Sequence, residues 1–405
     1  MNKSIFEAAQ PILNNLITHD YQAYFVGGSV RDYLMHKEIH DIDITTSATP
    51  DEIEAIFDKT IPIGREHGTI NVVYKHEQYE ITTFRAEGEY DDHRRPNAVY
   101  FVRDLYEDVK RRDFTMNAIA MDTHYHILDY FNGQQDIENK IIRTVGDAAE
   151  RFNEDALRII RGLRFQAQLG FMLEESTYLG MKSHIASIEH LSIERIIVEL
   201  KKLFTGKYIT QSYNNLKSLN AFNYITYFNQ FDFTKFQVNL PVEFTLLIAA
   251  LKVQQPMVEA SLSMLKISNQ EKKAITKYER LIQTIPNISS KNDLKYFVYD
   301  YGKVDIINVL NHSELLHDNQ IIDLQPLIVN RDTINETYAQ LPITSRKQIA
   351  INGNDILTTL NQPGGAWLKP LLRDIECAII RGEINNQKNE ILEMGENTCQ
   401  NIVKM

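Results

Sequence analysis

The amino-acid sequence predicts an α+β fold, with a small mixed β-sheet and a few helices in the first part and helices alone in the rest. Before about residue 150, short runs of β-branched and aromatic residues alternate with polar residues, which is typical of half-buried strands. After that point apolar residues recur with the helical period of about 3.6 residues, and strand signals nearly vanish. We therefore expect a sheet-containing head followed by an all-α remainder.

The individual elements follow from these two patterns. Strands are predicted in "AYFVGG", "DIDITT", "TINVVY", "YEITTFR" and "HILDYF", and a short helix in "SVRDYLMHKE". Long helices are predicted in "ERFNEDALRIIRGLRFQAQLG", "SIERIIVELKKLF" and "SNQEKKAITKYERLIQTI". Asn, Ser, Gly and Pro residues between the helical stretches indicate divisions near residues 210 and 330. Four segments are thus expected, 1–150, 151–210, 211–330 and 331–405.

Length and composition limit the classes of protein. The 405-residue chain is too long for one core of ordinary size and carries a formal charge of −11. This charge argues against coating nucleic acid by bulk attraction, so a nucleic-acid partner would have to bind local basic patches. Two cysteines, Cys377 and Cys399, support neither a disulfide framework nor a cysteine zinc site. Because signal-peptide and membrane-helix patterns are missing, we expect a soluble, cytoplasmic protein without a membrane partner.

A pair of carboxylates is the first chemical feature. In "HDIDIT", strand alternation places Asp41 and Asp43 on one face of a strand. Two such carboxylates can share hard divalent cations such as Mg²⁺, which favours a two-metal phosphoryl-transfer site. The alternative is two solvated acids at the end of a strand. Glu80, opposite its apolar neighbours in "YEITTFR", is a further candidate for metal support or for deprotonating an attacking hydroxyl, unless it is merely exposed.

A glycine turn precedes the carboxylates. "FVGG" ends a strand and "SVRD" opens a helix, so Gly27 and Gly28 would let backbone N–H groups approach a phosphate. Arg31 lies in the first helical turn and could contact a triphosphate bidentately. Most Gly-Gly turns only reverse the chain. The combination with the carboxylate pair is therefore the stronger signal.

These segments resemble a known family. "GGSVRD…DIDITTSA", "KRRDFTMNAIA", "LDYFNGQQDI" and "RFNEDALRIIRGLRF" occur in the order and spacing of the class II tRNA nucleotidyltransferases, which are the bacterial CCA-adding enzymes, and of the similar bacterial poly(A) polymerases. The motifs cover roughly the first 200 residues. The resemblance implies a polymerase-beta-like nucleotidyltransferase head (1–150), a helical neck with a nucleotide-base template (151–210), a helical body (211–330) and a helical, tRNA-binding tail (331–405).

The resemblance also implies an activity and roles for single residues. The activity is template-independent addition of CCA to the 3′ end of tRNA from CTP and ATP, with Mg²⁺ bound by Asp41 and Asp43. Nucleotide-binding roles are expected for Gly28, Arg31, Arg112, Asp155, Arg158, Arg161 and Arg164. Supporting roles are expected for Gly27, Asp32, Arg111, Asp113, Asn117 and Glu154. The segment "YDDHRRPNAVYF", with Arg94, Arg95 and Pro96, matches a loop implicated in switching to ATP.

The segment "NEDALRIIRGLRF" sets Asp155, Arg158, Arg161 and Arg164 at every third position of a predicted helix. A bland explanation is a surface salt bridge between Asp155 and Arg158 beside two solvated arginines. Hydrogen-bond inventories favour base reading, because cytosine and adenine present an amino donor beside a ring-nitrogen acceptor, whereas uracil and guanine present the reverse. The resemblance assigns this reading to Asp155 and Arg158. Phe165 falls on the same polar half, and packing against the head is the only role that the sequence suggests for it.

Several alternatives remain at this point. A poly(A) polymerase, or an enzyme that adds only CC or only A, would carry the same motifs. A non-catalytic RNA-binding protein could keep the scaffold, although the carboxylate pair is present and speaks against it. The sequence leaves open whether the protein is a homodimer.

Overall fold

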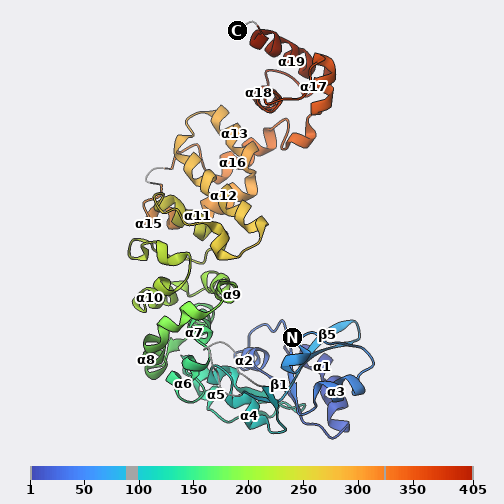
Figure 1. Ribbon diagram of the computed structural model, residues 1–405, viewed down its shortest axis with the longest axis vertical. Helices are drawn as coiled ribbons and strands as arrows, with labels where there is room; N and C mark the ends of the chain where they lie inside the picture. Colours follow the sequence, from blue (N-terminus) through green and yellow to red (C-terminus); the bar gives the residue numbers. More distant parts are fainter. Residues whose placement is uncertain (1, 88–98, 323–324, 404–405) are drawn as a thin grey trace. The chain divides into compact units, whose positions relative to one another are not determined.

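The computed structural model describes residues 2–87, 99–322 and 325–403, and confirms the α+β fold class (Figure 1). The chain divides into two compact units. The first comprises Met1–Thr234, Val238–Pro241 and Ala260–Lys266, and the second comprises Lys235–Gln237, Val242–Glu259 and Ile267–Met405. The sheet belongs to the first unit. The expected divisions near residues 210 and 330 stay a prediction.

The sheet of the first unit has seven strands in the order β3-β4-β5-β2-β1-β8-β9. Only β2 and β5 are parallel neighbours, so the sheet is mixed as expected. All five predicted strand segments contain strands. The strands are β1 Ala23–Val26, β2 Asp43–Thr46, β3 Thr60–Ile61, β4 Thr69–Tyr74, β5 Glu77–Thr83, β8 Ile119–Met121 and β9 Ile127–Asp129.

Helices that surround the sheet are α1 Asn2–Thr18, α2 Gly28–Leu34, α3 Pro50–Ile56, α4 Leu105–Lys110 and α5 Gly133–Glu138. Helix α1 buries an apolar stripe with helical spacing, and its Phe6 meets Phe25 of β1 edge-on with 4.8 Å between ring centroids. A short antiparallel pair, β6 Arg85–Glu87 and β7 Val99–Phe101, lies beside them. The predicted loop with Arg94, Arg95 and Pro96 lies outside the described residues.

The first unit continues with α6 Ala148–Glu154, α7 Leu157–Leu169, α8 Glu175–His184, α9 Ile193–Phe204 and α10 Ile209–Ser218. The two-residue strands β10 Ile141–Ile142 and β11 Met172–Leu173 pair in parallel, a departure from the expected all-α remainder. The prediction of one helix through "NEDALRIIRGLRF" is wrong, because the chain leaves helical geometry at Asp155 (φ −138°, ψ 101°). Its carboxylate accepts a hydrogen bond from the Leu157 backbone N–H, a local bond that competes with the helical ladder.

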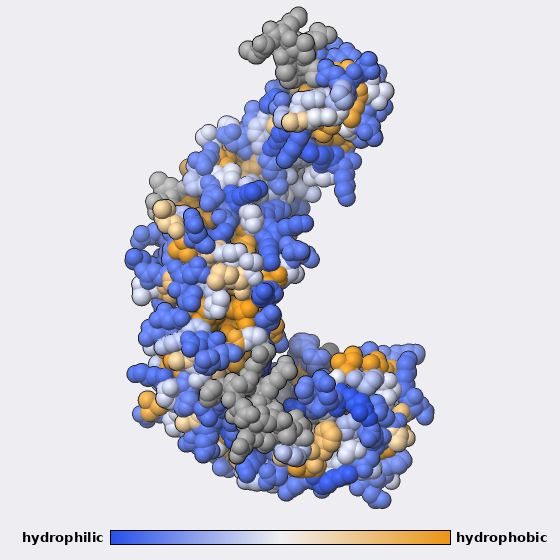
Figure 2. Space-filling view, in the orientation of Figure 1, coloured by the Kyte–Doolittle hydropathy of each residue, from blue (hydrophilic) through white to orange (hydrophobic). Residues whose placement is uncertain are grey.

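The described part of the second unit is helical. Its helices are α11 Phe244–Gln254, α12 Asn269–Thr284, α13 Lys291–Tyr301, α14 Lys303–Asn311, α15 Ser313–Asp318, α16 Arg331–Gln340, α17 Gly353–Leu360, α18 Leu368–Arg381 and α19 Lys388–Val403. Short 3₁₀ turns occur in both units: η1 Arg65–His67, η2 Thr115–Asn117, η3 Ile185–His190, η4 Ala221–Tyr224, η5 Phe228–Gln230, η6 Phe233–Lys235, η7 Leu262–Leu265, η8 Ile285–Asn287 and η9 Arg346–Gln348. Figure 2 shows mainly hydrophilic side chains on the visible face. Within the described ranges, no helix combines the length and apolarity needed to span a bilayer.

Candidate active site

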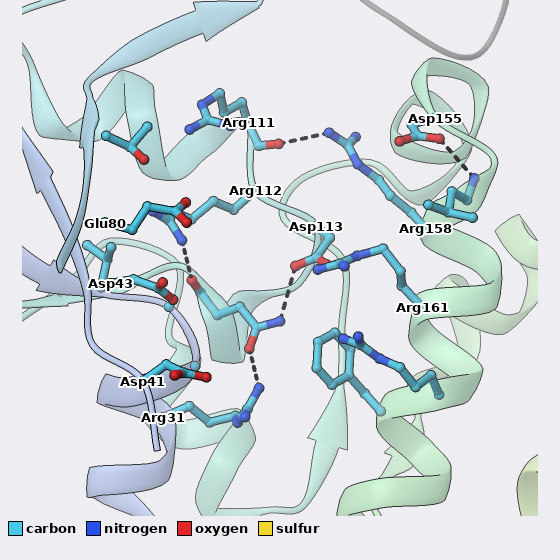
Figure 3. Close-up of a pocket in the computed structure, with 18 of the residues that line it drawn as sticks. Arg31, Asp41, Asp43, Glu80, Arg111, Arg112, Asp113, Asp155, Arg158 and Arg161 are labelled. Carbon is cyan, nitrogen blue, oxygen red and sulfur yellow. Dashed lines mark hydrogen bonds and ion pairs between the residues drawn. The ribbon is translucent and has the colours of Figure 1, made fainter. Parts of the chain in front are cut away.

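A cavity of about 960 Å³ in the first unit collects most of the predicted site residues. Strand ends of the sheet form one wall, and α7 and α9 form another (Figure 3). Every predicted site residue lines this cavity except Asp32 and Glu154, which lie behind the arginines that they contact. Nine cationic side chains and five carboxylates line it, although the whole chain carries a charge of −11. The cavity therefore favours a polyanionic ligand.

Three carboxylates form one side of the cavity. Ile42 and Ile44 are buried while Asp41 and Asp43 face the solvent, so the predicted alternation is confirmed, although β2 begins only at Asp43. The strand starts there because its partner β1 ends at Val26, which pairs with Asp43. Asp43 is also in register with Glu80 of the parallel strand β5, and Figure 3 shows all three carboxylates on the same side of the cavity.

The surroundings of Asp43 and Glu80 disfavour the charged forms of these two carboxyl groups. Partial burial in the cavity raises the pKa of Asp43 against the opposing charge of Arg112, and Asp41 adds to the rise. Partial burial and then the charge of Asp43 raise the pKa of Glu80. Such a cluster of oxygen ligands is the donor set that a hard divalent cation prefers, and a bound cation would relieve the repulsion.

The glycine turn brings the backbone close to these groups. Gly27 has a φ of +72°, a conformation that side chains rarely adopt. A Cβ atom on Gly27 would lie 3.2 Å from Nη1 of Arg112 and 3.3 Å from Oδ2 of Asp43. Helix α2 starts at the next residue, and its Arg31 donates from Nε to Asp32 (2.9 Å). At this turn, main-chain atoms without a side chain thus lie beside Arg112 and the candidate catalytic residue Asp43.

The segment "KRRD" is anchored by a residue that the sequence interpretation missed. Asp108 of α4 is fully buried, and its carboxylate contacts Nη2 of Arg111 at 2.8 Å and Nη2 of Arg112 at 3.5 Å. Burial opposes ionisation of Asp108, but the two guanidinium groups outweigh it and lower the pKa of this carboxyl. The i, i+3 and i, i+4 spacing from Asp108 to the two arginines is the signal that could have revealed it.

Asp113 joins the head to α7. Nε of Arg161 donates to its Oδ2 at 2.8 Å, and Nδ2 of Asn117 donates to its Oδ1 at 3.2 Å. Asn117 in turn accepts from Nη1 of Arg31 at 2.7 Å (Figure 3). Burial alone would raise the pKa of Asp113, but Arg161 and these hydrogen bonds lower it to about 2. The carboxylate is therefore ionised at neutral pH.

Asp155 and Arg158 line the same cavity but have separate partners. Oδ2 of Asp155 accepts from Nη2 of Arg195 at 2.9 Å. Nη1 of Arg158 donates to Glu154 at 2.6 Å, and its Nη2 donates to the backbone carbonyl of Arg111 at 2.9 Å. Arg158 is 7% exposed. The alternative of a surface salt bridge between Asp155 and Arg158 is therefore wrong.

The expectation of two solvated arginines under that alternative is wrong too. Arg161 binds Asp113, and Nη1 of Arg164 lies 3.1 Å from Oε2 of Glu199. Glu199 and Arg195 are one turn apart on α9, and the sequence interpretation missed both. Their signal was two charged residues at i and i+4 in the strongly amphipathic stretch "SIERIIVELKKLF". Helix α9 thus supplies partners for the charged residues of α7 and of the break before it.

Comparison with known proteins supplies the family. A model of the poly A polymerase head domain matches residues 23–143, one described as a probable RNA- and SrmB-binding site of polymerase A matches residues 170–227, and one described as a putative tRNA nucleotidyltransferase domain 2 matches residues 242–394. The CCA-adding enzyme of Staphylococcus saprophyticus is 60% identical over 391 residues, which cover 96% of this chain and 98% of that protein. The chain belongs to the CCA-adding enzyme family.

The chain matches further relatives over nearly their whole length. The CCA-adding enzyme of Staphylococcus aureus strain RF122 is 54% identical over 98% of this chain and 99% of its own. The crystal structure of the Bacillus stearothermophilus CCA-adding enzyme in complex with CTP superposes with a TM-score of 0.79 at 32% identity and covers 98% of both chains. The protein is thus a tRNA nucleotidyltransferase, and the predicted family is confirmed.

Proposed function

We propose that this enzyme builds and repairs the 3′-terminal CCA of tRNA from CTP and ATP, without a nucleic-acid template and with release of pyrophosphate. The observation that carries the proposal is the cavity, which sets a carboxylate cluster opposite an arginine-rich wall in a member of this family. A triphosphate needs the arginines, and a metal-assisted transfer needs the carboxylates. Full-length likeness to CCA-adding enzymes supports the CCA product over poly(A).

Asp41 and Asp43 would hold Mg²⁺, with Glu80 as a supporting ligand or as the acceptor of the proton from the attacking hydroxyl. Burial first and a neighbouring carboxylate second raise the pKa values of Asp43 and Glu80, and oxygen ligands gathered in such a partly buried place suit a hard cation. Bound in a pair, Mg²⁺ would activate the tRNA 3′-hydroxyl and neutralise the leaving pyrophosphate. Arg112, beside Gly27, and Arg31, beside Gly28, would bind the triphosphate.

Base choice would fall to Asp155 and Arg158. Each oxygen of the Asp155 carboxylate accepts one hydrogen bond from the protein, and a carboxylate oxygen can accept two, so the group can still bind an amino group of cytosine or adenine. Arg158 would donate to the ring nitrogen of the same base. Uracil and guanine would place a carbonyl oxygen against the Asp155 carboxylate and a ring N–H against the Arg158 guanidinium. Acceptor would then face acceptor and donor would face donor, so both bases would be rejected.

The tRNA itself would contact the helical parts of the chain. We assign residues 1–150 to the catalytic head, 151–210 to the neck, 211–330 to the body and 331–405 to a tRNA-binding tail. Support comes from the RNA-binding description of the model that matches residues 170–227, and from the tRNA nucleotidyltransferase model that matches 242–394.

The deciding experiment uses a tRNA that lacks its last three nucleotides. Given CTP and ATP together, the enzyme should extend it by three nucleotides, and CTP alone should give two. Unlimited growth with ATP alone would identify a poly(A) polymerase, and addition of only CC or only A would identify a split activity. Removal of Mg²⁺ by EDTA should stop extension.

Two variants test the residue roles. Asp41→Ala should abolish incorporation while tRNA still binds, as measured by filter binding; a variant that extends tRNA normally removes Asp41 from the mechanism. Asp155→Ala should relax discrimination against UTP and GTP in single-nucleotide incorporation. Unchanged selectivity would reduce Asp155 to a helix-breaking, ion-paired residue.

A further inference from the structure

Phe165 of α7 lies among three guanidinium groups. Their carbon atoms are 5.4 Å (Arg31), 5.6 Å (Arg161) and 4.1 Å (Arg164) from the centroid of its ring. The ring is 6% exposed and meets Phe114 edge-on at 5.9 Å between centroids. Packing against the head, the role that the sequence suggested, is confirmed, but it does not explain why three cations converge on one phenyl ring.

The same three arginines are linked by a chain of polar contacts. From Arg31 the chain runs through Asn117 and Asp113 to Arg161. From there Glu199 continues it, with its two oxygens 3.6 Å from Nη1 of Arg161 and 3.1 Å from Nη1 of Arg164. The contacts of Arg31 and Arg164 with Phe165 complete a closed network of side chains from α2 of the head and from α7 and α9 of the helical part.

Arg164 shows why the phenyl ring matters. Its Nε is buried, and within residues 2–87, 99–322 and 325–403 no acceptor is within hydrogen-bonding reach of it. Burial lowers the pKa of Arg164, and Arg161 and Arg31 lower it further against the opposing charge of Glu199. A cation in such surroundings gains from the negative face of an aromatic ring, and 4.1 Å is a short separation for this contact.

We propose that Phe165 is a positioning residue that holds Arg31, Arg161 and Arg164 together as a preformed receptor for phosphate oxygens. The inference deepens the proposed function, since the phosphates would be those of the nucleotide or of the tRNA end. A ring attracts cations without carrying net charge, so it orders the guanidinium groups and leaves their positive field available. A carboxylate in its place would order them as well, but it would also repel the phosphate.

The test replaces Phe165 by phenylalanines with one, two and three ring fluorines. Fluorine withdraws charge from the ring face and leaves the shape of the side chain nearly unchanged, so a purely structural role would not respond. We expect KM to rise stepwise, by about threefold to tenfold over the series, with kcat changed less and the melting temperature nearly constant. KM for CTP and KM for tRNA are measured separately. A rise for CTP identifies the triphosphate as the ligand, and a rise for tRNA identifies a phosphate of its 3′ end.

Phe171 provides the matched control, because it is a buried ring in the same apolar core. The same fluorinated residues at position 171 should leave both KM values unchanged. Unchanged KM values at position 165, or an equal rise at position 171, would overturn the inference. Phe165→Leu should raise KM more than the fluorinated residues do, and Phe165→Tyr should restore most of the loss.

Direct titration with CTP separates this inference from the proposed function. Isothermal titration calorimetry of the enzyme with CTP, in the absence of tRNA, measures nucleotide binding even if the product of the reaction is not CCA. Weaker CTP binding with each added fluorine supports the CTP triphosphate as the ligand of the three arginines. Equal CTP affinity across the series, together with an unchanged KM for tRNA, refutes the role of Phe165.

Discussion

Replacement of Asp113 by asparagine tests the ionic link between the head and α7. The substitution keeps the size of the side chain but removes the charge that faces Arg161. In the folded protein the pKa of Asp113 is lowered from 3.8 to about 2. The folded state therefore favours the ionised carboxylate, and the resulting stability is fully present above pH 4 and is lost as the pH falls through 2.

The magnitude follows from this shift. A lowering of nearly two pKa units corresponds to roughly 2 kcal/mol in the free energy of unfolding at pH 7. The same linkage leaves roughly 1 kcal/mol at pH 3 and only a small remainder at pH 2. Asp113→Asn should therefore destabilise the first unit at neutral pH, and the difference from the unmodified protein should shrink as the solution becomes acidic.

Hydrogen exchange of peptides that cover β8 and the preceding residues measures this effect locally, and urea unfolding followed by circular dichroism measures it for the whole chain. Asp58→Asn, at an exposed aspartate of the same unit, serves as the control and should change little. A stability loss that stays constant between pH 7 and pH 3 would refute the ionic reasoning. It would show that asparagine disturbs packing rather than charge.

Three further predictions concern the cavity. Gly27→Ala should lower kcat for CTP incorporation by about tenfold or more, because alanine is strained at the positive φ of this position and its methyl group crowds Arg112 and Asp43. An unchanged rate would show that the turn can move. Glu80→Gln should raise the melting temperature in EDTA at pH 7, because the raised pKa of Glu80 means that its charge costs stability in this site. The gain should vanish at low pH, where the glutamate is protonated and as neutral as the glutamine that replaces it. A lower melting temperature of the variant at pH 7 would contradict this. Arg195→Met should weaken selection of CTP over UTP several-fold in misincorporation assays, because Asp155 loses the partner that orients it, whereas unchanged selectivity would show that the Leu157 N–H alone suffices.

The local parts of the site could be predicted from the sequence. Alternation in "HDIDIT" was enough to place Asp41 and Asp43 toward solvent between buried isoleucines, because side chains on a strand alternate whatever packs against it. The glycine turn before α2 was predictable for a similar reason, since the positive φ at Gly27 is a local backbone requirement.

The partners of the charged residues could not be predicted. Helical spacing placed Asp155 beside Arg158, yet Asp155 binds Arg195, 40 residues later, and Arg161 binds Asp113, 48 residues earlier. A local hydrogen bond to Leu157 also broke the helix that the periodicity predicted.

The sequence by itself thus determined the alternation at Asp41 and Asp43, the glycine turn, the change from a sheet-containing head to a largely helical remainder, and the family. Only the tertiary structure decided which acid neutralises which arginine, and that three arginines share the ring of Phe165. The physical reason is that strand alternation and backbone conformation are set within a few residues. Ion pairs and cation–π contacts between distant segments depend instead on how the helices pack against the head, which no local pattern encodes.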